Sequence, residues 1–330
     1  MTVKSLVSKK TIYAVVAIAA IIIVVGAALS LNQQKPNNST PKAAIIDQLS
    51  SSDLTYSSRY PNQTFVNATT TLLHEYFSEV DYYSNNATVD NYEKLASEGY
   101  KLIIWRAHSA LDLSNAYVAI STTENSVTSD TSEYESMYRD GTLTLCNITG
   151  DPTLYWSITP KFVSETMDGR FDDTVIILMS CNGLETGYTQ TAEALQEKGA
   201  RAIISWNNWI EASSNDGATA MLLNYLIDQN NTIQQAVSKI PPQQSPLGPS
   251  QMQFFPTNNE TANYHIPNYN EKTTVSGALS KGTLNSETID VEGMNRADHE
   301  LQVDSAKLLD VSVALKLSEI AGYAELRRKD

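Results

Sequence analysis

Short runs of consecutive apolar residues recur along the middle of the chain, each bounded by polar or turn-forming residues. Five of them, rich in Ile and Val, are too short for helices and are typical of strands buried in a parallel sheet. These runs cover residues 43–49, 80–83, 100–106, 174–179 and 202–206. Apolar residues at helical spacing predict helices at 64–78, 90–97, 191–198, 216–229 and 233–239. The alternation predicts an α/β fold with a mostly parallel sheet flanked by helices.

Two segments interrupt this alternation. Residues 112–168 are rich in Ser, Thr, Asp and Asn, and the runs at 141–149 and 153–158 predict an inserted hairpin. Residues 241–271 are rich in Pro, Gln and Asn and predict an extended loop. The α/β domain is therefore expected over residues 43–240. Apolar residues at 273–275, 288–291 and 309–317 predict a small β-rich module at 272–330.

The N-terminal part of the chain has the pattern of a membrane anchor. Residues 13–31 form a charge-free apolar stretch whose length is close to that needed to cross a bilayer. Lys4, Lys9 and Lys10 precede it. We expect a cytoplasmic tail at 1–10, a transmembrane signal anchor at 11–31, a linker at 32–42 and an extracellular remainder. A signal peptide cleaved after Ser30 is the alternative.

Glycosylation motifs and charge agree with an extracellular location. Every Asn-x-Ser/Thr triplet follows the apolar stretch, beginning at Asn37, Asn38, Asn62, Asn67, Asn86, Asn147, Asn230 and Asn259. Beyond residue 31 the chain has 20 basic and 37 acidic residues. An acidic surface repels phosphate backbones, which argues against a nucleic-acid partner.

Reactive side chains directly follow two of the predicted strands. His108 comes after the run 100–106, and Cys181 comes after 174–179. Chemistry in parallel sheets gathers at the carboxyl ends of the strands, so neighbouring strands would bring these residues to one cleft. A thiol needs a base to form thiolate, and histidine has a suitable proton affinity. Backbone amides of Cys181 and of Ser109 or Ala110 are expected to bind the oxyanion.

At this point the chain resembles the caspase-hemoglobinase superfamily of clan CD cysteine peptidases, which includes gingipains, clostripain and CHAT domains. The resemblance rests on YKLIIWRAHS at 100–109, VIILMSCNG at 175–183, AEAL at 192–195, GARAIISW at 199–206 and DGAT at 216–219. In that family a His after the third strand and a Cys after the fourth form a catalytic dyad. The resemblance therefore implies a caspase-like sheet and a dyad of His108 and Cys181. Ser109 stands where the family has glycine.

The substrate groove is expected beside the strand after the nucleophile. Its candidate residues are Trp206, Asn207, Asn208, Trp209, Glu211 and Asp216. Glu211 or Asp216 would meet a cationic substrate side chain. The alternative is that the tryptophans are core residues and the acids are solvated.

The remaining titratable residues offer few other sites. His265 is the rival base, whereas His74 and His299 are expected to be solvent-facing or packed. No cluster has metal-ligand spacing and no phosphate-binding loop follows a strand, so we expect neither a metal nor a cofactor.

These patterns lead to one prediction and two alternatives. We expect a membrane-anchored extracellular cysteine peptidase acting on a peptide or protein substrate. The first alternative is a catalytically inactive module that binds peptide or glycan. The second is a structural surface glycoprotein with a Cys146–Cys181 disulfide.

Overall fold

The computed structural model describes residues 40–127 and 131–270 of the 330-residue chain. A six-stranded sheet with the order β10-β9-β8-β3-β1-β2 forms its centre. The strands are β1 (Lys42–Asp47), β2 (Glu79–Tyr83), β3 (Tyr100–Arg106), β8 (Thr174–Met179), β9 (Ala200–Trp206) and β10 (Met252–Phe255). The first five are parallel to their neighbours and β10 is antiparallel to β9. The five predicted strands and the mostly parallel sheet are confirmed.

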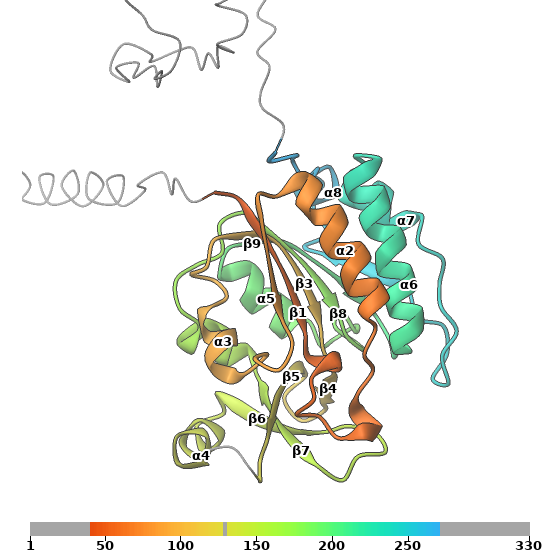
Figure 1. The fold of residues 1–330 in the computed structure, drawn as a ribbon. Helices are drawn as coiled ribbons and strands as arrows, with labels where there is room; N and C mark the ends of the chain where they lie inside the picture. Colours follow the sequence, from red (N-terminus) through yellow and green to blue (C-terminus); the bar gives the residue numbers. More distant parts are fainter. Residues whose placement is uncertain (1–39, 128–130, 271–330) are drawn as a thin grey trace, which may run out of the picture. The chain divides into compact units, whose positions relative to one another are not determined.

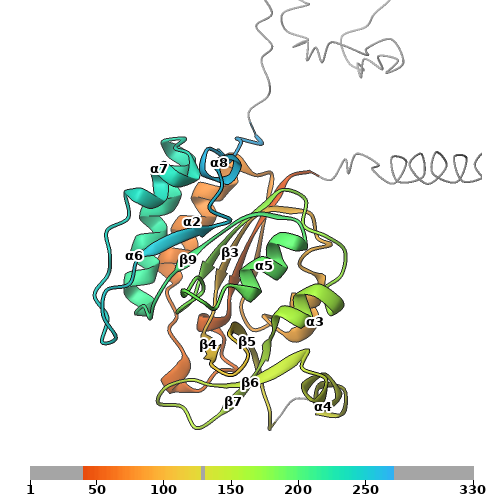
Figure 2. The same ribbon diagram turned by 180° about the vertical axis from the view of Figure 1, so that it is seen from behind.

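Helices cover both faces of this sheet. One face carries α2 (Gln63–Tyr76), α6 (Ala212–Leu223), the π-helix η4 (Asn224–Asp228) and α7 (Ile233–Ser238) (Figure 1). The opposite face carries α3 (Val89–Lys94), α5 (Gln190–Glu197) and the π-helix η3 (Phe162–Thr166) (Figure 2). The hydrophobic core lies between the sheet and these two layers, because the inner strands β1, β3, β8 and β9 are apolar on both faces.

Local side-chain chemistry explains where the helices begin. The Asn62 side chain accepts a hydrogen bond from the Phe65 amide and caps α2. Thr232 and Gln235 form a capping box at the start of α7. Gly199 makes the turn from α5 into β9 at φ +111°, where an added Cβ would lie 2.2 Å from the Phe171 carbonyl oxygen. Glycine is therefore required at that turn.

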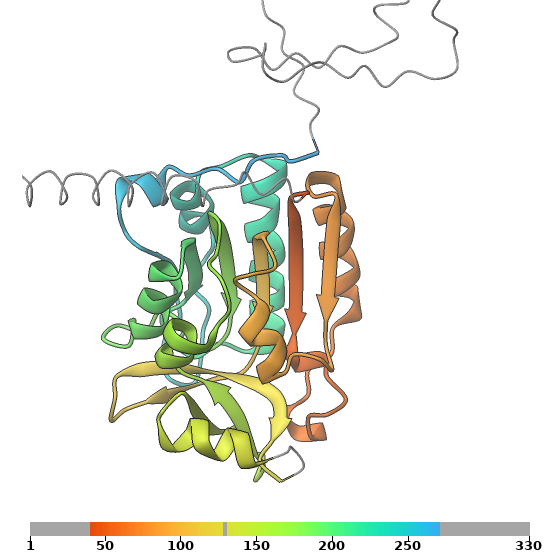
Figure 3. The same ribbon diagram turned by 90° about the vertical axis from the view of Figure 1, so that its left-hand side faces the viewer.

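A second, antiparallel sheet has the strand order β4-β5-β7-β6. Its strands are β4 (Ser109–Asp112), β5 (Tyr117–Asn125), β6 (Leu143–Asn147) and β7 (Leu154–Ile158), and α4 (Thr131–Arg139) lies between β5 and β6. The predicted hairpin is confirmed as β6 and β7, but the insertion is larger than expected. Figure 3 shows this sheet at the carboxyl ends of the parallel strands.

The expected loop over residues 241–271 is wrong for part of its length. Met252–Phe255 forms β10 at the edge of the central sheet, and α8 (Asn259–Ala262) follows it. The polar residues on both sides of this short strand hide it in the sequence pattern. Its backbone pairing with β9 stabilises it as a strand.

Two other predictions lie outside the described residues: the membrane anchor at 11–31 and the C-terminal β-rich module at 272–330. Within residues 40–127 and 131–270, the structure contains no helix with the length and apolar character of a membrane span.

Candidate active site

The pairing of β3 with β8 brings the two reactive residues to one edge of the sheet. Arg106 pairs with Met179 at the end of the parallel ladder, and His108 and Cys181 each follow two residues later. Beyond that pair the segments stay joined, because the Ala107 amide donates to the Met179 carbonyl at 3.3 Å. The Ser109 hydroxyl also donates to the Cys181 carbonyl. The segments that carry the imidazole and the thiol are therefore neighbours.

Cys181 lies against the segment that follows β9. Its thiol contacts the backbone of Ile210 twice, with Sγ 3.5 Å from the carbonyl oxygen and 3.5 Å from the amide nitrogen. Burial raises the pKa of this thiol, and the hydrogen bond from the Ile210 amide offsets only part of that effect. Cys181 is therefore a protonated thiol at neutral pH in the resting structure.

The backbone around Cys181 makes a sharp turn. Asn182 has φ +58°, and its amide donates to the Asn208 carbonyl at 3.0 Å. The next residue, Gly183, is packed so closely that a Cβ there would lie 2.1 Å from Ser205 Oγ. This turn fixes the direction in which the polypeptide leaves Cys181.

His108 is held by backbone and side-chain groups that come from before α2. Its Nε2 lies 2.8 Å from the Ser58 carbonyl oxygen, and the Tyr60 ring meets the imidazole edge to face at 5.8 Å between centroids. A carbonyl oxygen only accepts, so the neutral imidazole carries its proton on Nε2 and has its lone pair on Nδ1. Burial lowers the pKa of His108, although the bond to Ser58 opposes this. The imidazole is therefore a neutral base at pH 7.

The two side chains do not bond to each other in the resting structure. Within the described residues, the thiol contacts the backbone of Ile210 and the imidazole contacts the carbonyl of Ser58. Catalytic hydrogen bonds are often long before substrate binds and shorten in the reactive complex. The arrangement thus fits a nucleophile and base at rest.

A buried charge network lies directly beside this pair. The Arg106 guanidinium donates to Asp47 Oδ1 at 2.8 Å, to Asp216 at 2.6 and 2.9 Å, and to the Tyr60 carbonyl at 2.8 Å. Asn62 donates to the same Asp216 carboxylate at 2.9 Å. Arg106 is 1% exposed, Asp47 0% and Asp216 4%. The sequence signal for this network was a charged residue at the end of an apolar strand.

Asp216 and Glu211, both expected as acidic substrate contacts, have different surroundings. The Asp216 carboxylate is buried and bound by Arg106 of the chain itself, so a substrate cation would have to displace an internal one. Glu211 is exposed at the start of α6.

The tryptophans and asparagines expected in the groove also differ from one another. Trp206 is 1% exposed and donates to Asn215 at 2.9 Å, so it is a core residue. Asn207, Asn208 and Trp209 are partly exposed in the segment next to Cys181, and the Asn208 carbonyl accepts a hydrogen bond from the Asn182 amide. Of the predicted groove residues, these three stay beside the thiol and partly accessible.

The amides expected to bind an oxyanion belong to two kinds of structure. Ser109 and Ala110 begin β4 and pair with Ile120 and Ala119, rather than forming a turn. Cys181 follows the end of β8, where the parallel ladder has stopped. Of the three amides expected to bind an oxyanion, only that of Cys181 therefore follows the end of a strand, as expected.

The residues that competed with this site lie elsewhere. Cys146 is buried in β6 of the second sheet, and both cysteines are free thiols. His265 is exposed and its Nδ1 lies 2.9 Å from the Asn230 carbonyl oxygen. His74 lies on α2 and is exposed, whereas His299 is outside the described residues.

The glycosylation motifs differ in exposure. Asn67, Asn86, Asn147, Asn230 and Asn259 are exposed, Asn62 is partly buried, and Asn37 and Asn38 lie outside the described residues.

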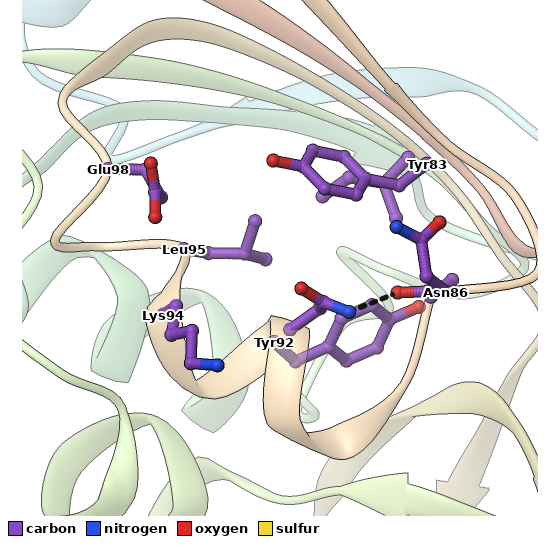
Figure 4. A pocket seen from close by; sticks show the side chains of 9 residues that line it. Tyr83, Asn86, Tyr92, Lys94, Leu95 and Glu98 are labelled. Atoms are coloured by element: carbon purple, nitrogen blue, oxygen red, sulfur yellow. Dashed lines mark hydrogen bonds between the residues drawn. The ribbon is translucent and has the colours of Figure 1, made fainter.

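A small pocket lies apart from the candidate pair, between the end of β2 and α3 (Figure 4). Tyr83 and Tyr92 point into it, and Asn91 donates to the Asn86 carbonyl at 2.8 Å. The residues that line it include neither a cysteine nor a histidine. In the part of the chain that the structure describes, no group of His, Cys, Asp and Glu side chains has the arrangement of a metal site.

Sequence reasoning missed Ser58, whose carbonyl contacts the imidazole. Ser58 lies 50 residues before His108 in the chain, and no local motif links the two. Arg106 lies inside the segment 100–109, where no sequence pattern marks it as the centre of a buried ion-pair network. Comparison of the sequence with family models and with curated proteins finds no match.

Proposed function

We propose that this protein is a cysteine peptidase in which Cys181 is the nucleophile and His108 the general base. The observation that carries the proposal is the register of β3 and β8. Their last paired residues are Arg106 and Met179, so His108 and Cys181 each lie two residues beyond the same pair. His108 follows the third parallel strand of the central sheet in chain order and Cys181 follows the fourth. That placement agrees with the resemblance to clan CD peptidases.

The protonation states support a neutral resting pair. The thiol keeps its proton because burial raises its pKa, and the imidazole stays neutral because burial lowers its pKa. Nδ1 of His108 is the nitrogen with a free lone pair, because Nε2 is committed to Ser58. A substrate that displaces the Ile210 contacts would allow the thiol proton to pass to Nδ1.

The reaction then follows from these groups. As the proton moves to Nδ1, the sulfur attacks the peptide carbonyl carbon, and the Cys181 amide stabilises the oxyanion. The C–N bond breaks and the imidazolium protonates the leaving amine. Water attacks the thioester and gives a proton to Nδ1, which then returns to the sulfur as the acid product leaves. Each proton released is taken up, and the enzyme is restored.

The proposed setting is the outer face of a membrane, with residues 11–31 as the anchor. This rests on the charge-free N-terminal stretch and on the glycosylation motifs that follow it. Five of those asparagines are exposed on the described part of the chain.

A thiol-directed peptide electrophile tests the proposal. The full chain is treated with peptidyl vinyl sulfones that differ in the P1 side chain, and the labelled residue is identified by mass spectrometry. We expect label on Cys181, loss of label in Cys181→Ser and slower labelling in His108→Asn. Cys146→Ser is the matched control and should label like the parent, because Cys146 is buried in the other sheet.

Turnover is measured on a peptide library with the same variants. Cleavage that survives in Cys181→Ser would refute the proposal. A free Cys181 that resists every electrophile would instead identify a binding module without activity.

A further inference from the structure

Asp151 is a buried carboxylate that the proposed reaction does not use. It lies in the connection between β6 and β7 of the second sheet and is 3% exposed. No ion pair with a Lys or Arg holds it within the described residues. Hydroxyl and amide groups bind it instead: those of Thr55, Ser58 and Tyr155, and the Thr153 amide at 2.8 Å. A buried carboxylate needs such donors, since burial without them is costly.

Two of these donors, Thr55 and Ser58, come from the segment that holds the imidazole. The Ser58 hydroxyl donates to Asp151 Oδ2, and the carbonyl of the same residue accepts from His108 Nε2 at 2.8 Å. Thr55 donates its hydroxyl to Asp151, and its amide donates to Tyr155 Oη at 3.1 Å. Ser58 itself is 0% exposed. The polar groups of Thr55 and Ser58 are therefore tied to the second sheet through this carboxylate, beside the apolar contact of Leu54 with Ile148 and Tyr155.

The segment has little regular structure of its own. Tyr56–Ser58 is a single 3-10 turn, η2, between the end of β1 and the start of α2. No residue of this turn belongs to a strand, although Arg106 of β3 holds the Tyr60 carbonyl that follows it at 2.8 Å. Asp151 is the fixed point for the Ser58 side chain, and the Ser58 carbonyl contacts the imidazole.

We propose that Asp151 is a positioning residue for His108, which it serves by fixing Ser58 so that the Ser58 carbonyl holds the imidazole proton on Nε2. This rests on the proposed function, because it assigns His108 the role of base. The second sheet thus contributes to the site although neither reactive side chain belongs to its strands.

The charges around His108 set the sign of the expected change. Arg106, two residues earlier, lowers the pKa of the imidazole, while Asp151 raises it; burial is the largest effect and lowers it. Asp47 and Asp216 both pair with Arg106. The Tyr60 ring meets the imidazole, and the Ser109 hydroxyl joins the segment of His108 to the segment that carries the neutral Cys181 thiol.

Removing the negative charge of Asp151 should therefore lower the pKa of His108 further. Simple loosening of the site would do the opposite, because exposure to water would return the pKa toward its ordinary value of about 6.5. The direction of the change distinguishes positioning from a general loss of structure.

The experiment compares Asp151→Asn with Asp140→Asn in the full chain. Asp140 is an exposed matched control, because it binds the amide and hydroxyl of Thr142 just as Asp151 binds the Thr153 amide, but it does not contact residues 55–58. Nitrogen-15 chemical shifts of the His108 ring, assigned with His108→Asn, report its pKa and tautomer. The rate of Cys181 labelling by a peptidyl vinyl sulfone reports reactivity.

In Asp151→Asn we expect a lower pKa for His108, loss of the single Nε2–H tautomer and labelling slower by about 10-fold to 100-fold. Asp140→Asn should match the parent in all three. Ser58→Ala removes only the hydroxyl link and should also mix the tautomers, which keeps the test valid if Asp151→Asn folds poorly.

A His108 pKa that rises in Asp151→Asn, or a tautomer that stays unchanged in both Asp151→Asn and Ser58→Ala, would overturn the proposal. Failure of the proposed function is seen separately. If the parent protein is never labelled but the ring responds as expected, the positioning role stands and the peptidase role falls. If the parent is labelled and the ring does not respond, the reverse holds.

Discussion

Arg106 offers the sharpest test of how the candidate site is held together. Its guanidinium is 1% exposed and makes four hydrogen bonds, three of them to the carboxylates of Asp47 and Asp216. Arg106→Met keeps an unbranched side chain of similar length but leaves two buried carboxylates without their cation. Removing one partner of a buried ion pair costs about 3–5 kcal/mol of unfolding free energy.

The matched control is Arg201→Met. Arg201 also contacts two carboxylates, Asp173 and Glu260, but its side chain is 26% exposed and theirs are 38% and 75% exposed. Water screens such pairs, and their contribution is about 0–1 kcal/mol. The difference between the two variants therefore isolates burial, since both lose an arginine bound by two acids.

The assay is equilibrium unfolding in urea, followed by fluorescence, for both variants and the parent. We expect Arg106→Met to lose several times more stability than Arg201→Met. Adding Asp216→Asn to Arg106→Met should recover part of the loss, because it removes one of the unpaired charges. Equal losses in the two arginine variants would refute the reasoning.

Three further predictions concern single positions. Burial lowers the pKa of His108 in the folded state, so below about pH 6.5 the unfolded chain binds a proton that the folded chain does not. The unfolding free energy should therefore fall between pH 7.5 and pH 5.5, and urea midpoints should show a smaller fall in His108→Asn. Gly183→Ala places a Cβ 2.1 Å from a buried hydroxyl and should lower the melting temperature, whereas Gly217→Ala in helix α6 meets nothing within 4 Å and should raise it slightly; calorimetry compares the two. In a host that glycosylates Asn-x-Ser/Thr, glycopeptide mass spectrometry should find glycan on exposed Asn67 but not on Asn62, whose amide is bonded to a buried carboxylate; glycan on both in the folded protein would contradict this.

The parallel strands could be predicted because their environment leaves a clear pattern. Buried on both faces, β3 and β8 are continuous apolar runs, and their ends place His108 and Cys181 without knowledge of any other contact. The candidate pair followed directly from those two runs.

The second sheet could be predicted only in part. β5 contains the polar run Ser121, Thr122 and Thr123, a pattern typical of a loop, yet all three residues are buried. Thr122 donates to the Trp156 carbonyl at 2.9 Å and Ser157 donates to the Ser121 hydroxyl at 3.1 Å. Hydroxyls satisfied by a neighbouring strand are acceptable inside a sheet, but the sequence does not show which strand satisfies them.

The support of the imidazole could not be predicted for a related reason. Asp151 and Ser58 are brought together by the packing of the second sheet against the segment after β1, and no periodic pattern encodes that contact. The internal ion pair of Asp216 was also hidden, because its partner Arg106 lies 110 residues earlier in the chain.

All four strands of the second sheet lie in the connection from β3 to β8, and its β6–β7 hairpin carries Asp151. An insertion in a connecting loop can ordinarily be exchanged between related proteins, because it changes the surface and leaves the central sheet intact. In this protein, the exchanged insertion would also have to supply an acceptor for the Thr55 and Ser58 hydroxyls, which precede α2 and bond to Asp151. Exchange of this insertion alone should therefore give folded chimaeras in which Ser58 and the His108 ring lose their fixed position, unless the donor protein supplies an acid at the equivalent hairpin.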